Sequence, residues 1–193
     1  MERKLATVLF VDLVDSTSLV TGSDPEVVRR RVNEFFDRVS RCVTTHGGIV
    51  EKFAGDAVLA AFGIPQAHED DAERAVRAAL AMRESVHELG LETRIGVEAG
   101  EVVADESAST FATGAAVNVA ARLQQAAAPG EILMGPGAHR LSLGGVEAED
   151  VGPVELRGTQ GATWVWRVLG ARWWATLRCR ACARPAVLRD GAG

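Results

Sequence analysis

Two aspartates stand where a carboxylate is unusual. Asp12 interrupts the apolar, β-branched run of residues 6–14, and Asp56 follows Ala54-Gly55 between two further apolar runs. An ionised carboxylate beside a buried strand is costly unless a positive group meets it. Two carboxylates a few ångströms apart repel each other and commonly hold a hard cation such as Mg²⁺. The pair therefore predicts a cation site if the fold brings the two together; otherwise Asp56 is a turn former and Asp12 a strand-end residue.

Three further side chains are candidates for substrate binding. Asn118 and Arg122 are four residues apart in a segment of helical character, which places them on the same helix face. An amide and a guanidinium there can grip a substrate jointly; the alternative is a surface pair bonded to each other. Lys52 is one of only two lysines among 21 basic residues. Unless chance alone kept it, a lysine in a chain that otherwise uses arginine indicates a site that needs a compact ammonium.

The first half of the chain predicts the elements that position both aspartates. Residues 6–14 are typical of a central strand by length and composition. Asp24-Pro25-Glu26 supply the cap, the first-turn proline and the acidic residue that open a helix. Residues 49–53 and 57–62 predict a hairpin with Asp56 at its tip. If that hairpin lies beside the first strand, the two carboxylates face each other at one edge of the sheet.

The second half predicts two more helices and further strands. Its expected elements are a helix ending at Gly90, two strands over residues 94–99 and 101–104 divided at Gly100, a helix over 117–127 and a strand over 131–134. Residues 135–150 are rich in glycine and have little periodicity, and residues 154–156 and 163–169 predict a closing hairpin. Interleaved hairpins and helices predict an α+β fold, with helices packed on an antiparallel sheet.

Composition limits the class of protein. The chain has 193 residues, of which 47% are apolar and 24% charged, as in an ordinary globular domain. Residues 171–193 carry a net charge of +4 within a total of −5, so the remainder is acidic, which argues against nucleic acid as a partner. No apolar run is long enough to span a membrane, and three cysteines fit a reducing cytoplasm. We expect a folded domain over residues 1–170, and a basic tail or linker over 171–193.

Four strings of the sequence resemble the catalytic domain of class III adenylate and guanylate cyclases of the bacterial type. They are VLFVDLVDST, HGGIVEKFAGDAVLAAFG, AHEDDAERAVRAAL and VNVAARLQQAAAPGEIL, in the family's order and spacing. The resemblance runs from about residue 6 to residue 170. It implies a ferredoxin-like βαββαβ core, which agrees with the order of elements read from the residues themselves.

The resemblance also implies roles for individual residues. Asp12 and Asp56 match the aspartates that hold two divalent ions, Mg²⁺ or Mn²⁺. Asn118 matches the residue that orients the ribose, Arg122 the one that offsets charge on phosphorus in the transition state, and Lys52 the lysine that selects the base. Backbone N–H groups of the segment after the first strand match the phosphate-binding positions, which are Leu13, Val14, Asp15, Ser16 and Thr17.

The implied function is an adenylate cyclase that converts ATP into 3′,5′-cyclic AMP and pyrophosphate in intracellular signalling. In the family the metals come from one subunit and the lysine, asparagine and arginine from the other, which implies a head-to-tail homodimer. One position departs from the pattern: Phe111 stands where the family has a second base-selecting residue, and phenylalanine cannot accept a hydrogen bond from the adenine amino group. Thr110 and Thr113 flank it as substitutes. The alternative function is a weak or inactive cyclase-like module that binds nucleotide and regulates or dimerises.

Overall fold

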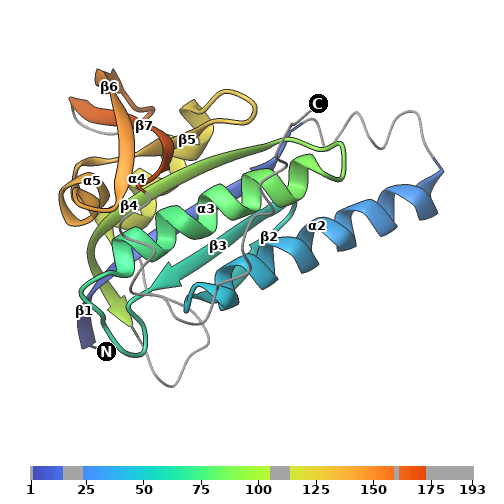
Figure 1. Ribbon diagram of the computed structural model, residues 1–193, viewed down its shortest axis with the longest axis horizontal. Coiled ribbons are helices and arrows are strands. Elements are labelled where there is room, and N and C mark those ends of the chain that lie inside the picture. The colour runs from blue at the N-terminus through green and yellow to red at the C-terminus, as the bar shows by residue number, and fades with distance from the viewer. Residues whose placement is uncertain (1, 15–23, 105–113, 159–160, 173–193) are drawn as a thin grey trace, which may run out of the picture.

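A seven-stranded sheet with helices on both faces forms the framework in the computed structural model (Figure 1). The structure describes residues 2–14, 24–104, 114–158 and 161–172. The strands are β1 (Glu2–Leu13), β2 (Ile49–Ala54), β3 (Ala57–Phe62), β4 (Thr93–Ala104), β5 (Ile132–Met134), β6 (Val146–Glu155) and β7 (Ala162–Ala171). The helices are α2 (Pro25–Thr45), α3 (Asp71–His87), α4 (Ala115–Ala126) and α5 (Pro136–Ser142). The α+β fold predicted from the sequence is confirmed.

The strand order puts β1 in the interior of the sheet. Neighbouring strands follow the order β2-β3-β1-β4-β5-β7-β6. β1 pairs antiparallel with β3 on one side and with β4 on the other, from Glu2 opposite Ala104 to Leu13 opposite Thr93. β4 and β5 run parallel, and the β6–β7 hairpin pairs with β5 through β7. The hairpin of β2 and β3 therefore lies beside the first strand, which is the condition that the sequence set for Asp12 and Asp56 to meet.

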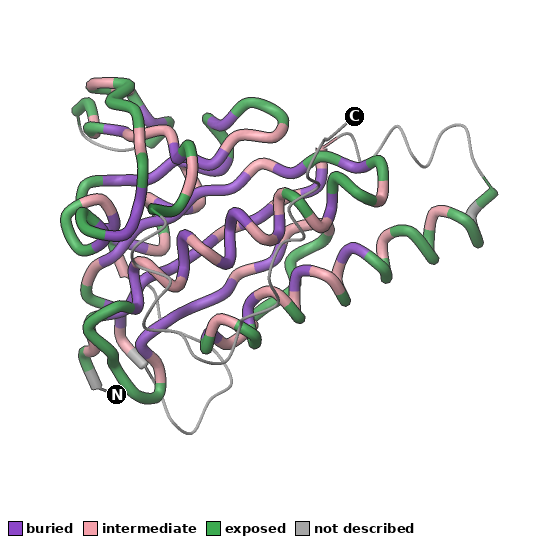
Figure 2. Tube along the Cα trace, viewed as in Figure 1, coloured by how far each residue is buried: buried purple, intermediate pink, exposed green. Residues whose placement is uncertain are grey.

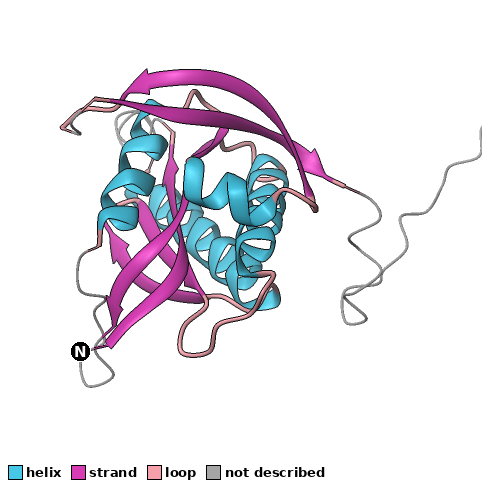
Figure 3. Cartoon of the chain, turned by 90° about the vertical axis from the view of Figure 1, so that its left-hand side faces the viewer, coloured by secondary structure: helices cyan, strands magenta, loops and turns pink. Residues whose placement is uncertain are grey.

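The two faces of the sheet are covered by different helices. Alternate residues of β1 point to opposite faces: Leu9 and Val11 join the core formed with α2 and α3, whereas Ala6 and Val8 join the core formed with α4. Figure 3 shows helices on both sides of the sheet, and the two separate cores place α4 on the side opposite to α2 and α3. By the same alternation Asp12 belongs to the α4 face.

The helix α2 begins where the sequence predicts. The Asp24 side chain accepts a hydrogen bond from the backbone N–H of Glu26 at 2.9 Å, and Pro25 occupies the first turn. The C-terminal half of α2 packs on the sheet through Phe35, Val39 and Val43. The N-terminal half extends beyond the sheet and is largely exposed (Figure 2).

Two predictions about the second half of the chain are wrong. Gly100 does not divide two strands, because β4 pairs with β1 without interruption from Thr93 to Ala104. A Cβ atom on Gly100 would lie 3.1 Å from the Ala116 Cβ, so this glycine makes room for α4. The stretch predicted as irregular contains α5 and the start of β6, and both strands of the predicted closing hairpin are longer than expected.

The outer strands of the sheet, β2 and β6, are irregular. The pairing of β2 with β3 shifts register between Val50 and Lys52. The pairing of β6 with β7 shifts between Glu147 and Ala148 and again between Asp150 and Gly152. The described structure ends soon after the last strand. β7 ends at Ala171, and residues 173–193 of the predicted basic tail lie outside the described residues. No helix in the described part of the chain is long and apolar enough to cross a membrane.

Candidate active site

Asp12 and Asp56 meet at one end of the sheet. Asp12 lies opposite Ala57 of β3 and Arg94 of β4, and Asp56 directly precedes Ala57 in the hairpin turn. Burial raises the pKa of Asp12, and the nearby charge of Asp56 raises that pKa further. Three influences lower that pKa: a hydrogen bond from the Gln124 side chain, a backbone hydrogen bond from Leu13, and the charge of Arg94. The structure therefore meets the condition set by the sequence: the carboxylates are close enough to repel.

We call the end of the sheet where Asp12 and Asp56 meet the carboxylate corner. Its oxygen donors fit a hard divalent cation. Both side chains offer carboxylate oxygens, which Mg²⁺ and Mn²⁺ prefer, and the pKa of Asp12 is raised first by burial and then by the negative charge of Asp56. In the described residues, no group of three or more histidine, cysteine, aspartate or glutamate side chains could hold a metal. A cation here would need further oxygen donors, which suits Mg²⁺ because it usually binds through one or two carboxylates plus water and substrate phosphates.

The helix α4 presents Asn118 and Arg122 away from this corner. Asn118 is exposed, and Arg122 donates from Nη1 to Oε1 of Gln125 at 2.9 Å. Within the described residues, then, Asn118 and Arg122 are not bonded to each other. Gln124, two residues after Arg122, donates from Nε2 to Oδ2 of Asp12 at 3.1 Å. Two residues turn a helix by about 200°, so Arg122 projects from the side opposite to its own chain's Asp12.

Lys52 shares the α4 face of the sheet with Asp12. In the strand register Lys52 lies opposite Leu59, which in turn lies opposite Phe10, and paired residues share a face. Phe10 and Asp12 are alternate residues of β1 and point to the same face, so Lys52 lies on the face that carries Asp12. Lys52 is exposed, and its strand is separated from β1 by β3, so about 10 Å of sheet lies between the two backbones. One chain does not bring Lys52 and Arg122 together with the carboxylate pair.

The predicted phosphate-binding segment is described only at its start. Leu13 is buried at the end of β1, and the backbone N–H of Val14 donates to the carbonyl oxygen of Glu92 at 2.9 Å. A phosphate contact by Val14 would have to replace that bond. The other predicted positions, Asp15, Ser16, Thr17 and the base-selecting position Phe111, lie outside the described residues.

Sequence reasoning missed Arg94 and Gln124. Arg94 faces Asp12 across the β1–β4 pairing, and its Nε is buried without a hydrogen-bond partner in the described part of the chain. Gln124 belongs to the buried stripe of α4 together with Ala116, Ala120 and Leu123. An amide in an otherwise apolar stripe was the available signal, because a buried amide needs a polar partner.

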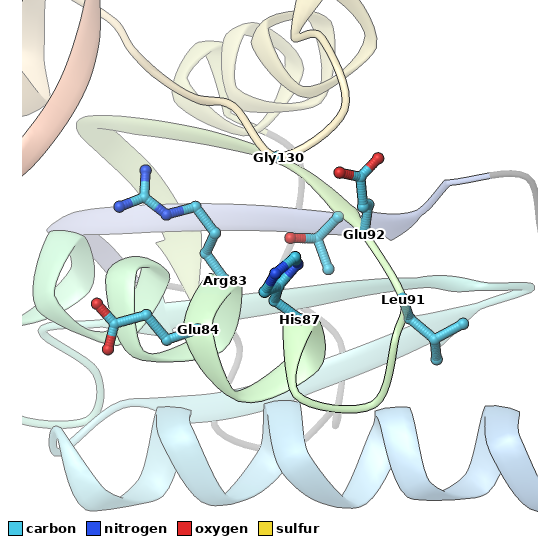
Figure 4. Close-up of a pocket in the computed structure, with 7 residues that line it drawn as sticks. Arg83, Glu84, His87, Leu91, Glu92 and Gly130 are labelled. Carbon is cyan, nitrogen blue, oxygen red and sulfur yellow. The ribbon is translucent and has the colours of Figure 1, made fainter.

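A separate cavity of about 210 Å³ lies at the end of α3. Figure 4 shows Arg83, Glu84 and His87 coming from the last turns of this helix, and Leu91 and Glu92 from the segment that leads into β4. Thr93 also lines the cavity, but its Oγ1 has almost no accessible surface. None of the predicted site residues lines this cavity.

Comparisons with known proteins identify the family of the chain. Residues 2–169 match the family model described as the adenylate and guanylate cyclase catalytic domain. The chain is 34% identical over 137 residues to adenylate cyclase 1 of Rhizobium meliloti, a match of 63% of this chain and 21% of that protein. It is 40% identical over 129 residues to an uncharacterized protein of Mycobacterium tuberculosis, with 63% of this chain and 23% of that protein covered. The matched part of the chain thus covers less than a quarter of the length of each of these two proteins.

Solved structures give the same result. The adenylyl cyclase CyaB from P. aeruginosa superposes with a TM-score of 0.82 and 27% identity, over 89% of this chain and 97% of that chain. The guanylyl cyclase Cya2 superposes with a TM-score of 0.79 and 29% identity, over 89% of this chain and 95% of that chain. These relatives include both adenylyl and guanylyl cyclases. The chain belongs to the adenylate and guanylate cyclase catalytic domain family.

Proposed function

We propose that this domain is an adenylate cyclase, which forms 3′,5′-cyclic AMP and pyrophosphate from ATP in a head-to-tail homodimer. The observation that carries the proposal is the corner of Asp12 and Asp56, with Lys52 on the same face of the sheet. The family, the similarity to a protein named adenylate cyclase 1 and the lysine at the base-selecting position all support it. The proposed setting is the cytoplasm, where ATP is available and the free thiol of Cys42 stays reduced.

In this proposal Asp12 and Asp56 bind two divalent ions, Mg²⁺ or Mn²⁺. When bound, the ions supply Lewis-acid chemistry: they favour loss of the proton from the ribose 3′-hydroxyl and offset the charge of the triphosphate. The two carboxylates hold the ions at one place in the sheet. The partial burial of Asp12 strengthens its attraction for a cation, because the local dielectric is lower than in water.

The other roles belong to side chains from the second subunit. Asn118 orients the ribose, and Arg122 stabilises the charge that develops on the phosphorus oxygens as the bond forms. Lys52 donates a hydrogen bond to adenine N1, which favours ATP over GTP. The opposed directions of Arg122 and Gln124 on α4 support a site made by two chains, since Arg122 is turned away from its own Asp12.

A second candidate is a cyclase-like module that binds nucleotide without turnover. The observation in its favour is Phe111, which provides no acceptor for the adenine amino group. In that case the domain would still dimerise and bind nucleotide, and the bound nucleotide would act by changing its contacts with other proteins or domains. The two candidates differ in whether a cyclic product forms.

Turnover of ATP and of GTP by the purified protein with Mn²⁺ tests the proposal. The cyclic product is measured directly, at protein concentrations high enough to favour a dimer. We expect cyclic AMP from the unchanged chain and none from Asp56→Ala. Asp37→Ala is the matched control, because Asp37 is an exposed aspartate on α2, and it should keep full activity.

The alternatives give different results. If neither nucleotide gives a product although the protein is a folded dimer that binds ATP, the adenylate cyclase proposal is wrong and the regulatory module is supported. Cyclic GMP as the main product would keep the cyclase and remove the role of Lys52 in choosing adenine. Full activity in Asp56→Ala would remove the metal assignment.

A further inference from the structure

The side chain of Gln124 links α4 to the carboxylate corner. Gln124 is 6% exposed, and its Nε2 donates to Asp12 Oδ2 at 3.1 Å across 112 residues of sequence. An ionised carboxylate can only accept hydrogen bonds, so the NH₂ group of the amide must face it. The bond is thus a defined contact between a buried helix residue and one member of the Asp12–Asp56 pair.

Gly96 fixes the distance over which this contact is made. A Cβ atom on Gly96 would lie 2.2 Å from the carbonyl oxygen of Ala120 and 2.4 Å from the backbone nitrogen of Gln124. Such distances are far below van der Waals contact, so the backbone of α4 rests directly on β4 because residue 96 is glycine. The position of Gln124 relative to Asp12 is therefore set by backbone packing, and flexible side chains have little part in it.

The chemistry of the contact suits a residue that holds a metal ligand. A lysine or arginine bonded to Asp12 would neutralise the carboxylate and compete with a cation. A neutral amide restrains the carboxylate and leaves its charge. Arg94 lies opposite Asp12 in the register, yet the two form no ion pair within 4.0 Å among the described residues. Among the side chains that the structure describes, Gln124 donates the hydrogen bond to Asp12, and the backbone of Leu13 adds a second one.

We propose that Gln124 is a positioning residue for Asp12: its amide fixes the orientation of the carboxylate and thereby sets the affinity of the site for a divalent cation. This inference rests on the proposed function, because it takes Asp12 as a ligand of that cation. Groups that orient a metal ligand typically change metal affinity or activity by about 10- to 100-fold when they are replaced.

The test measures metal binding in the absence of turnover. The probe is Mn²⁺ together with 3′-deoxy-ATP, which lacks the attacking hydroxyl. Binding to the protein is the loss of the free-Mn²⁺ electron paramagnetic resonance signal beyond the loss in a protein-free mixture of Mn²⁺ and the same nucleotide, because the triphosphate itself binds Mn²⁺. Gln124→Met keeps the length and the burial of the side chain but donates nothing, and it should weaken Mn²⁺ binding about tenfold or more. Ser142→Ala is the control: it removes a buried hydroxyl that bonds the Ala138 carbonyl at 2.7 Å, and Mn²⁺ binding should not change.

A double-mutant comparison separates positioning from a merely structural role. In an Asp12→Asn background, Gln124→Met should cause no further loss of Mn²⁺ affinity, because its effect passes through Asp12. Gly96→Ala should weaken Mn²⁺ binding with Gln124 still present, since the added Cβ displaces α4 from β4. Thermal unfolding of each variant shows whether it is folded.

The outcomes distinguish the inference from the proposed function. If the unchanged chain binds Mn²⁺ and Gln124→Met binds it equally well, the positioning role is overturned and the metal site remains. If Gln124→Met weakens binding equally with and without the Asp12 carboxylate, its role is structural and the inference fails. If the unchanged chain binds no Mn²⁺, the metal site itself is wrong, and both fall together.

Discussion

Asp56 stands one residue before Ala57, and Ala57 is the β3 partner of Asp12, so the two aspartates occupy one corner of the sheet. The repulsion between them raises the pKa of Asp12 beyond what burial alone would do. A corner with this charge carries an energetic cost when it holds no cation. The cost leads directly to a prediction about stability.

Asp12→Asn should raise the melting temperature of the metal-free protein at pH 7 to 8, and abolish metal-dependent turnover. Because the folded state raises the pKa of Asp12, it holds the proton more tightly than the unfolded chain, and stability falls as the pH rises through that pKa. The asparagine removes this penalty and still accepts a bond from Gln124. Melting curves by circular dichroism give the measurement, and the gain should shrink under acid conditions that protonate Asp12. A lower melting temperature at pH 7 to 8 would contradict the prediction.

Mixing two inactive variants should restore activity if each site is built from two chains. Asp56→Ala lacks the metal half of a site and Arg122→Ala the other half, so a mixed dimer has one complete site. Random pairing at equal amounts should give about a quarter of the unchanged activity, because half of the dimers are mixed and one of their two sites works. Mixing Asp56→Ala with Asp12→Asn is the control and should stay inactive. An inactive first mixture would contradict the shared site.

Lys52→Ala should reduce the preference for ATP over GTP about tenfold or more, because a hydrogen bond from a charged donor is worth about 1.5–3 kcal/mol. The measurement is the ratio of kcat/KM for the two nucleotides. Lys4→Ala is the matched control, since Lys4 is the other lysine and its Nζ donates to the carbonyl of Pro65. Phe111→Asp should have the opposite effect: it supplies an acceptor for the adenine amino group and should increase the preference for ATP. An unchanged ratio in Lys52→Ala would leave base selection to other residues.

Glu98→Leu should lower the free energy of unfolding by roughly 2–6 kcal/mol, because two buried backbone donors lose their acceptor. Glu98 is 6% exposed, and its Oε1 accepts from the N–H groups of Ala99 at 2.7 Å and Ala138 at 3.0 Å. Glu98→Gln keeps an oxygen acceptor there and should lose much less. Urea unfolding at neutral pH compares the two variants, and equal losses would show that the hydrogen bonds are not the cause.

The sequence was sufficient wherever the determinant is local. Asp24 caps α2 by bonding a backbone N–H two residues away, and that contact needs no tertiary information. The prediction that Asp12 and Asp56 meet required one further assumption, that the hairpin lies beside the first strand. The observed strand order shows that this assumption is correct.

Determinants that depend on distant packing were not readable. Gly100 has the local character of a turn, but the twelve-residue pairing of β1 with β4 holds it in a strand against Ala116. The bond between Gln124 and Asp12 joins residues 112 positions apart, and no local pattern links them. The helix α5 was missed because it has only seven residues, so periodicity has little length in which to appear.

The irregular outer strands limit how copies of the chain can associate. A neighbouring chain extends a sheet only where an edge offers an unbroken row of backbone donors and acceptors. The register shift in β2, the two shifts in β6, and Pro153, which has no N–H group, interrupt that row at both edges. Edge-to-edge growth into an open ribbon is thereby disfavoured. The proposed homodimer would therefore form through the faces of the fold, where a closed pair can form without further polymerisation.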